Sequence, residues 1–334
     1  MKNLLIILWL GFSITSLFSA PQSETKTLVL YSGRGESLVG PLVERFKAQT
    51  GIEVQVRYAG TPELTRLILE EGDRSPADVF WAQDVASLGT LHRANRFQNL
   101  PTNWYQKLLP SFQYSVPTWI PISGRARILY YNPQKVTVPA DGFAMEDLVQ
   151  PAYRGRVGWA LSNASFQLSV AALVQQWGRN RTLQWLRAMK ANGAKNFANN
   201  MALLDGIAAG EIDLALSNHY YLPRTLVSRP NLPIASTTFK NQDAGNLLNV
   251  SGVGILTTAK NLQSARRFVE FLLSEEAQRY FVEQTFEYTV IANVGQPTAA
   301  PNIDSYRQIA PKFDLNQLDL IDEVQALLRE AELL

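Results

Sequence analysis

Residues 25–58, TKTLVLYSGRGESLVGPLVERFKAQTGIEVQVRY, most constrain the fold of this chain. TLVLY is a short apolar, β-prone run typical of a buried strand, and IEVQVRY alternates as a second strand should. Between them the loop SGRGE leads into a helix, which Gly51 ends as a C-cap. The apolar positions at helical spacing are Leu38, Val39, Leu42, Val43 and Phe46. This strand–helix–strand unit predicts an α/β fold with a parallel sheet.

The same alternation continues along the chain. A helix over 61–72 opens with Thr61 and has Pro62 at its first position. The remaining segments are a strand at 77–82, a helix at 84–97, a second strand–loop–helix series from 154 to 178, a strand and loop at 209–223, and an amphipathic helical region at 263–284. The buried side of that last region is predicted to carry Phe268, Phe271, Leu272 and Phe281.

Two β-prone stretches, 117–132 and 247–259, separate the two α/β series. They predict two lobes, each with a doubly wound sheet, joined by crossing hinge strands. We expect an N-terminal lobe of residues 21–125 plus 251–300 and a C-terminal lobe of 126–250 plus 301–334. Ligands in such folds bind at the carboxyl ends of strands. The loops at 32–36, 81–84, 162–166 and 217–221 are therefore the candidate site.

The N-terminus, MKNLLIILWLGFSITSLFSA, predicts a signal peptide over residues 1–20. Its apolar core is too short for a membrane-spanning helix, which needs about 20 apolar residues. An uncleaved anchor is the alternative. The chain has no cysteine, which excludes a lipid-modified N-terminal Cys and every thiolate ligand or nucleophile. We expect a soluble periplasmic protein. A formal net charge of +2 is no footprint for nucleic acid.

Adjacent phenols in LSNHYYLPR, Tyr220 and Tyr221, are the main candidate for chemistry. Neighbouring side chains of a strand point to opposite faces, so both can face one site only where the strand has ended. Ser217, Asn218 and Pro223 favour such an end. A trivalent hard cation selects oxygen donors and displaces phenol protons. Packing is the alternative, because 12 tyrosines make an adjacent pair unremarkable.

Several segments are similar, in order along the chain, to the periplasmic ferric-ion-binding proteins of ABC importers, which have a type II periplasmic binding fold. They are LVLYSGRGESLV with FKAQTGIEVQVRY, LILEEGDRSPADVFWAQDVASL, SGRARILYYN, GEIDLALSNHYYLP and VSGVGILTTAKNLQSARRFVEFLLSEEAQ. The segment EEGDRSPADVF and the tyrosine pair after GEIDLAL are the most specific. The resemblance implies that Tyr220 and Tyr221 are phenolate ligands to Fe3+ in a cleft between two lobes.

The sequence departs from the family at three ligand positions. Gly35 stands where many members carry His, Gln83 where many carry Glu, and Phe166 where some carry a third Tyr. Two protein donors cannot fill an octahedral shell, so carbonate, bicarbonate, another small anion or waters are expected to complete it. Arg34, in a strand-to-helix loop, is the candidate for binding that anion bidentately. A solvated surface arginine is the alternative.

Other polar residues are candidate contacts to the anion, with turn or cap roles as alternatives. They are Asn163, Ala164 and Ser165 before the second-lobe helix, and Asn200 and Asn218. Arg224 is a candidate to lower the phenol pKa, and Trp81 to line the cleft. His219 is not expected to be a ligand, because a side chain next to the pair can point away. Asp78 and Asp84 suggest capping rather than a carboxylate pair.

These residues leave three functions to distinguish. The first is a monomeric binding protein that captures Fe3+ and hands it to an ABC permease in the inner membrane. The second is a protein of the same shape for another solute, such as an organic cation, a phosphonate or an oxyanion. An enzyme has little support, because the chain has no cysteine, no G-x-S-x-G or HExxH motif, and only two histidines.

Overall fold

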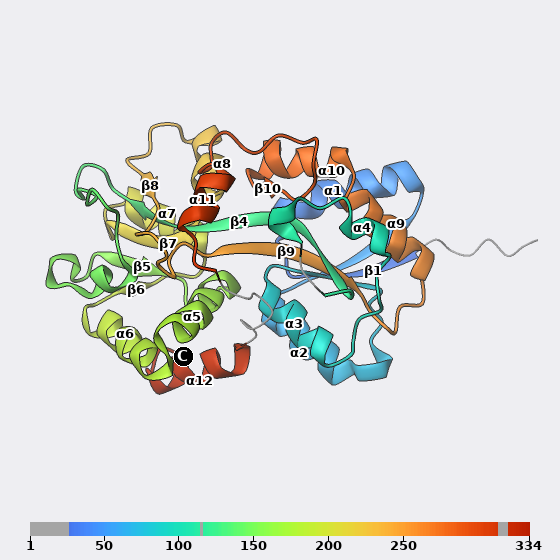
Figure 1. The fold of residues 1–334 in the computed structure, drawn as a ribbon, viewed down its shortest axis with the longest axis horizontal. Coiled ribbons are helices and arrows are strands. Elements are labelled where there is room, and N and C mark those ends of the chain that lie inside the picture. The colour runs from blue at the N-terminus through green and yellow to red at the C-terminus, as the bar shows by residue number, and fades with distance from the viewer. Residues whose placement is uncertain (1–26, 114–115, 313–319) are drawn as a thin grey trace, which may run out of the picture.

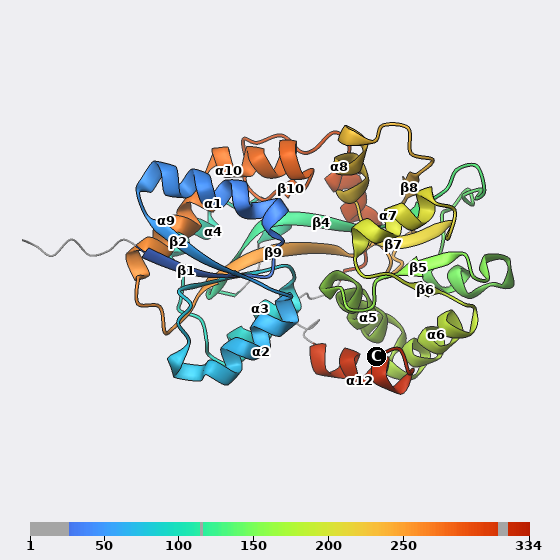
Figure 2. The same cartoon turned by 180° about the vertical axis from the view of Figure 1, so that it is seen from behind.

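The helices and strands form two halves. Two long strands, β4 and β9, extend from one half toward the other and connect them (Figure 1 and Figure 2). This computed structural model describes residues 27–113, 116–312 and 320–334, so the predicted signal peptide lies outside the described residues. The first half contains β1 (Thr27–Ser32), α1 (Glu36–Thr50), β2 (Glu53–Tyr58), α2 (Thr61–Glu71), β3 (Val79–Ala82), α3 (Val85–Arg93), α4 (Thr102–Tyr105), α9 (Leu262–Leu272), α10 (Glu275–Tyr280) and β10 (Tyr288–Thr289).

The second half contains β5 (Val157–Trp159), α5 (Ala164–Trp177), α6 (Arg179–Ala191), β6 (Lys195–Asn196), α7 (Asn200–Ala208), β7 (Leu214–Asn218), α8 (Tyr221–Ser228), β8 (Ala235–Thr237), α11 (Ile303–Ile309) and α12 (Ile321–Glu330). Short helical turns lie at Gly72–Arg74, Pro110–Phe112, Met145–Val149 and Pro151–Tyr153. Within the described residues, no helix is long and apolar enough to cross a membrane.

Both halves share one strand, β4 (Trp119–Tyr131). The strand order is β2-β1-β3-β9-β4-β7-β5-β6, with β10 and β8 also pairing with β4. The first part of β4 pairs antiparallel with β9 (Leu248–Ile255), and its last residues pair with β7 and β8. β1 pairs in parallel with β2 and β3, and β5 pairs in parallel with β6 and β7. The predicted α/β fold with crossing strands is confirmed, and the long strand β4 joins the described strands of the two halves into one ten-stranded sheet.

The local signals read from the sequence hold at several helix ends. Gly51 adopts φ 66° as the C-cap of α1, a conformation that glycine reaches without a Cβ penalty. The predicted helical region 263–284 is instead divided. Ser274 caps a new helix by accepting a hydrogen bond from the Ala277 N–H at 3.3 Å. A π-helical turn, Phe281–Thr285, then ends at Phe286, a non-glycine residue with φ 57°.

Aromatic side chains fill the cores of both halves. Trp81 is fully buried, edge-on to Phe268 and Phe281, and its indole N–H donates to Ser251 at 2.9 Å. Trp81 therefore belongs to the core of the first half rather than to the lining of a cleft, which corrects the expectation. In the second half, Trp159 packs edge-on against Phe166.

Candidate metal- and anion-binding site

The tyrosine pair lies where a strand passes into a helix. β7 ends at Asn218 and α8 begins at Tyr221, so the predicted end of the strand is confirmed. The two rings therefore lie side by side, with centroids 4.4 Å apart and planes inclined by 32°. Tyr220 is fully buried and Tyr221 is partly buried. Residues 218–222 are called the tyrosine loop below.

Two side chains fasten the tyrosine loop to the rest of the fold. The hydroxyl of Tyr130 on β4 accepts from the Leu222 N–H at 2.9 Å and donates to the Asn218 carbonyl at 2.6 Å. His219 Nδ1 accepts from the Ala126 N–H at 3.0 Å, and its Nε2 lies 2.8 Å from the Phe286 carbonyl, to which it donates. Burial lowers the pKa of His219 to about 4. Both ring nitrogens are engaged, so His219 has no free donor for a metal.

The phenol of Tyr221 is held neutral in the absence of a cation. Burial, and then the neighbouring phenol of Tyr220, raise its pKa well above the ordinary value of 10, against opposing effects of Asn200 and Arg34. Losing the proton therefore requires a strong positive charge close by. Tyr221 therefore offers an oxygen donor that ionises when such a charge arrives, and the phenol oxygen of Tyr220 lies on the adjacent ring.

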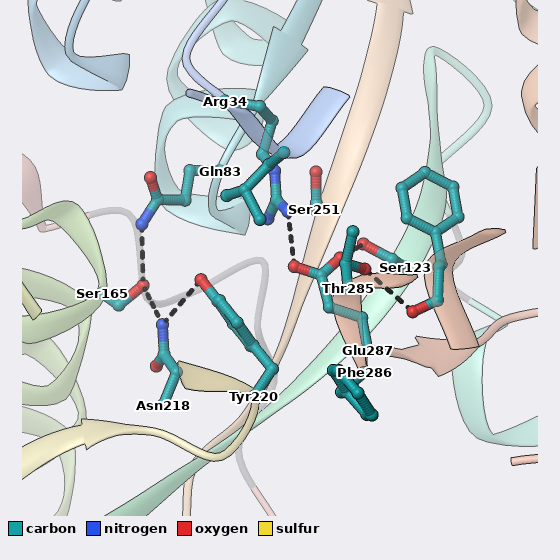
Figure 3. A network of polar contacts seen from close by, with 12 residues as sticks. Arg34, Gln83, Ser123, Ser165, Asn218, Tyr220, Ser251, Thr285, Phe286 and Glu287 are labelled. Atoms are coloured by element: carbon teal, nitrogen blue, oxygen red, sulfur yellow. Dashed lines mark hydrogen bonds and ion pairs between the residues drawn. The ribbon is translucent and has the colours of Figure 1, made fainter. Parts of the chain in front are cut away.

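Arg34 lies inside the molecule and not on its surface. It is 1% exposed, and one guanidinium nitrogen forms an ion pair with the fully buried Glu287. Glu287 also accepts from the Ser123 hydroxyl at 2.5 Å (Figure 3). The preceding Gly33 is required, because a Cβ there would lie 2.0 Å from Thr61 Oγ1. Nε and Nη1 of Arg34 have no hydrogen-bond partner among the described residues.

Sequence reasoning missed two further buried arginines, Arg125 and Arg127. Ser123, Arg125 and Arg127 occupy every second position of β4, so their side chains lie on one face of the strand. All three guanidinium nitrogens of Arg125, and Nη2 of Arg127, lack a hydrogen-bond partner among the described residues. Burial lowers the pKa of Arg127 to about 10. Two arginines two places apart in the crossing segment SGRARILYYN were the available signal.

We call Arg34, Arg125, Arg127 and Glu287 the arginine cluster. Burial acts to raise the pKa of Glu287, but the charges of Arg34 and Arg125 outweigh it and lower that pKa below its ordinary value. The charge of Glu287 in turn keeps Arg34 protonated against burial. The one carboxylate of Glu287 thus offsets only part of the charge of the cluster's three guanidinium groups. Buried donors without partners are costly, so this excess of positive charge fits an anion.

A chain of hydrogen bonds connects the two halves beside the tyrosine loop (Figure 3). Gln83, just after β3, donates from Nε2 to the Ser165 hydroxyl at 3.2 Å. Asn218 donates from Nδ2 to the same hydroxyl and to the Tyr220 hydroxyl, each at 3.3 Å. The Asn218 side-chain oxygen accepts from Arg127 at 3.0 Å. Asn218 therefore contacts both the tyrosine pair and the arginine cluster.

The remaining predicted contacts take different places. Asn163 caps α5 by accepting from the Ser165 N–H at 3.0 Å, and Ala164 is the first residue of that helix. Asn200 is buried beside Tyr221, and its side-chain oxygen accepts from the Ser217 hydroxyl at 3.2 Å. Gly35 is exposed, and a Cβ on it would meet no atom within 4 Å.

Phe166, Arg224 and the two aspartates also have defined surroundings. Phe166 is buried against Trp159, and the charge of Arg224 acts on Tyr280 of α10. Asp84 caps α3 by accepting from the Ser87 N–H at 3.0 Å, as predicted. Asp78 accepts from the Val29, Lys260 and Asn261 N–H groups, so its carboxylate joins β1 to the loop before α9.

Comparison with known proteins agrees with this architecture. Residues 31–279 match the family of bacterial extracellular solute-binding proteins. An Fe(3+)-binding periplasmic protein of Serratia marcescens is 31% identical over 93% of this chain and 92% of its own length. Iron uptake protein A1 of a Synechocystis strain is 35% identical over 87% of this chain and 83% of its own.

Among solved structures, iron-bound HitA from Pseudomonas aeruginosa superposes with a TM-score of 0.85 at 31% identity, covering 91% of this chain and 99% of the other. The TM-score and the coverage show that the two chains share one fold. The chain is therefore a bacterial extracellular solute-binding protein and belongs to the ferric-iron-binding protein family that its sequence resembles.

Proposed function

We propose that this protein captures Fe3+ between its two halves, using the phenolates of Tyr220 and Tyr221 and an exogenous anion, and delivers it to an ABC permease. The observation that carries the proposal is the pairing of two functional groups. Two adjacent phenol rings with centroids 4.4 Å apart lie near buried guanidinium groups, several nitrogens of which have no hydrogen-bond partner among the described residues. A hard cation suits the first group and an oxyanion suits the second.

The metal is held mainly by charge. Two phenolates offset two of the three positive charges of Fe3+, and the ion supplies the field that removes their protons. Two protein oxygens leave an octahedral shell incomplete. Gln83, whose amide donates to Ser165, stands where many family members carry an acidic ligand. The remaining positions are filled by the anion or by water.

Carbonate or bicarbonate is the proposed anion. Some nitrogens of Arg34 and Arg125 have no partner among the described residues. They can donate hydrogen bonds to an oxyanion without breaking any existing hydrogen bond. Ser165, Asn200 and Asn218 lie beside the phenols in the same half, and Asn163 and Ala164 begin the helix that presents Ser165. The anion then bridges the arginine cluster and the metal.

Capture and release follow from cleft closure. The tyrosine loop holds the metal on one lobe and the anion bridges from the other, so binding favours the closed state. Protonation of the phenolates or loss of the anion releases the ion. We infer a monomeric binding protein without catalytic activity, directed to the periplasm by residues 1–20. Its lobes are 21–125 plus 251–300 and 126–250 plus 301–334.

A second solute class has one observation in its favour. The three buried guanidinium groups of the arginine cluster outnumber its one carboxylate, an arrangement that also suits an organic oxyanion or phosphonate as the cargo itself. Colour separates the two functions, because ionised phenols bound to Fe3+ give a visible charge-transfer band that an organic ligand does not.

The test adds ferric citrate with bicarbonate to the purified protein. We expect a visible band that is lost in Tyr220→Phe/Tyr221→Phe. A protein that stays colourless, and that is instead stabilised against heat by a phosphonate, would refute iron capture. Tyr131→Phe is the matched control, because Tyr131 belongs to the other adjacent pair and lies outside the site.

A further inference from the structure

His219 contacts both neighbours of Glu287 in the chain. Its Nε2 donates to the Phe286 carbonyl at 2.8 Å, and its ring stacks on Tyr288 with centroids 4.5 Å apart and an 18° inclination. Glu287 lies between these two residues, and its carboxylate pairs with Arg34. A side chain of the tyrosine loop therefore contacts the residues before and after Glu287, the carboxylate that pairs with Arg34.

The segment that carries Glu287 needs such support. It follows the π-helical turn Phe281–Thr285, and Phe286 has φ 57°, in the left-handed region that is unfavourable for a non-glycine residue. Surrounding contacts must hold this conformation. The bond from His219 to the Phe286 carbonyl is one of them, and β10 pairs Tyr288 and Thr289 with Gly124 and Ser123 on the other side.

The opposite edge of the imidazole is equally fixed. Nδ1 accepts from the Ala126 N–H, while the main-chain N–H of His219 donates to the Ala126 carbonyl, both at 3.0 Å. The ring of Tyr220 meets His219 edge-on, with centroids 5.6 Å apart and planes at 90°. One buried imidazole thus contacts Tyr220, the crossing strand β4 and the segment of Glu287.

We propose that His219 is a positioning residue that couples the tyrosine pair to the arginine cluster, so that anion binding and metal binding reinforce each other. This inference rests on the proposed function. Without the hydrogen bond to Phe286, the Glu287 segment and the tyrosine loop move independently, and an anion at the arginine cluster stabilises the metal site less. Coupled sites typically change each other's affinity by about 5–150-fold.

The experiment measures the Kd for Fe3+ at low and at saturating bicarbonate and takes the ratio of the two. His219→Phe keeps a ring to stack on Tyr288 but removes both side-chain hydrogen bonds. In this variant we expect the ratio of the Kd at low bicarbonate to the Kd at saturating bicarbonate to be about tenfold smaller than in the wild type. His219→Gln, whose amide reaches the Phe286 carbonyl, retains most of the ratio, whereas His219→Asn, which reaches only Ala126, loses it.

Tyr130→Phe is the matched control. It removes the other fastening of the tyrosine loop, at Leu222 and Asn218, and Tyr130 has no hydrogen bond to Phe286 or Glu287. It is expected to weaken iron binding by the same factor at both bicarbonate concentrations. If His219→Phe behaves in that way too, leaving the ratio unchanged, the coupling role is overturned.

Hydrogen exchange in the metal-free protein gives a second measurement. His219→Phe must accelerate exchange in residues 281–289 together with 218–222, and His219→Gln must restore the first segment. Acceleration confined to 218–222 would contradict the inference. A wild-type protein that gives no charge-transfer band would refute iron capture. The exchange measurement would still test whether His219 links residues 218–222 to residues 281–289.

Discussion

The tyrosine loop and the arginine cluster face each other, and they satisfy their polar groups in opposite ways. In the tyrosine loop, Tyr130 and His219 anchor the backbone, and Asn218 donates to Tyr220. In the arginine cluster, two nitrogens of Arg34 and all three of Arg125 have no partner among the described residues. The polar groups of the tyrosine loop therefore have hydrogen-bond partners without a bound ion. The arginine cluster instead carries an excess of positive charge and has donors without partners among the described residues. Metal and protons should act on the first, and anions on the second.

Removing one phenol should have the largest effect. Tyr221→Phe leaves the ring in place but removes an oxygen that becomes charged next to a trivalent ion. Breaking a buried pair of unit charges costs about 3–5 kcal/mol, so the Kd for Fe3+ should rise by about 100- to 4,000-fold. Iron titration monitored through the visible band measures this.

Tyr131→Phe should leave that titration unchanged. Equal affinity of Tyr221→Phe and the wild type would remove the phenolates from the site. It would also end the contrast between a loop that responds to metal and a cluster that responds to anions.

Glu287→Gln should lower the stability of the fold more than a substitution in the tyrosine loop does. The substitution leaves Arg34 buried without its counter-charge, a loss of about 3–5 kcal/mol in the free energy of unfolding at neutral pH. Because Arg34 and Arg125 lower the pKa of Glu287 despite burial, its contribution is complete above the unfolded value of about 4.3. That contribution is lost as the pH falls through the folded value.

Denaturant unfolding at neutral pH and below pH 4 checks both points. The wild type should lose stability on acidification by more than Glu287→Gln does. Glu276→Gln, at an exposed surface pair with Arg45, is the control and should cost less than about 1 kcal/mol. A Glu287→Gln protein as stable as this control would mean that the arginine cluster needs no internal counter-charge.

Arg34→Ala should follow, with an effect that depends on the buffer. Loss of a group that orients the ligands of a metal typically costs about 10–100-fold in metal affinity. We expect that loss at low bicarbonate and a smaller one at saturating bicarbonate, because the remaining donors of the arginine cluster can then be occupied. Arg34→Lys keeps the charge beside Glu287 and separates charge from geometry. Equal losses in both buffers would contradict an anion role for Arg34.

The sequence predicts the parts of this site that depend on local pattern. Strand ends, the caps at Gly51 and Asp84, and the turn that brings the tyrosine rings together follow from residue type and spacing. The arginine cluster was only partly predictable. Arg125 and Glu287 are 162 positions apart in sequence and meet only through the pairing of β4 with β10. Nothing near Glu287 in sequence indicates a buried carboxylate.

Long-range packing also explains where the sequence-based predictions differ from the structure. Trp81 lies near the end of β3, beside the predicted ligand loop at 81–84, yet its ring packs in the core against Phe268 and Phe281 from distant segments. The break at Ser274 depends on the same tertiary setting, since a helical period continues through it. Side-chain direction at the end of a strand is not contained in local periodicity.

The smallest predicted effect concerns the bond between the two halves. Gln83→Ala removes the donor to Ser165 and touches neither the phenols nor the arginine cluster. One neutral hydrogen bond contributes about 0.5–1.5 kcal/mol, so the Kd for Fe3+ should rise by about two- to tenfold, with an unchanged dependence on bicarbonate. Gln106→Ala, at an exposed position, is the control. A bicarbonate dependence that changes with Gln83 would place it within the anion site, and the division between tyrosine loop and arginine cluster would then have to include β3.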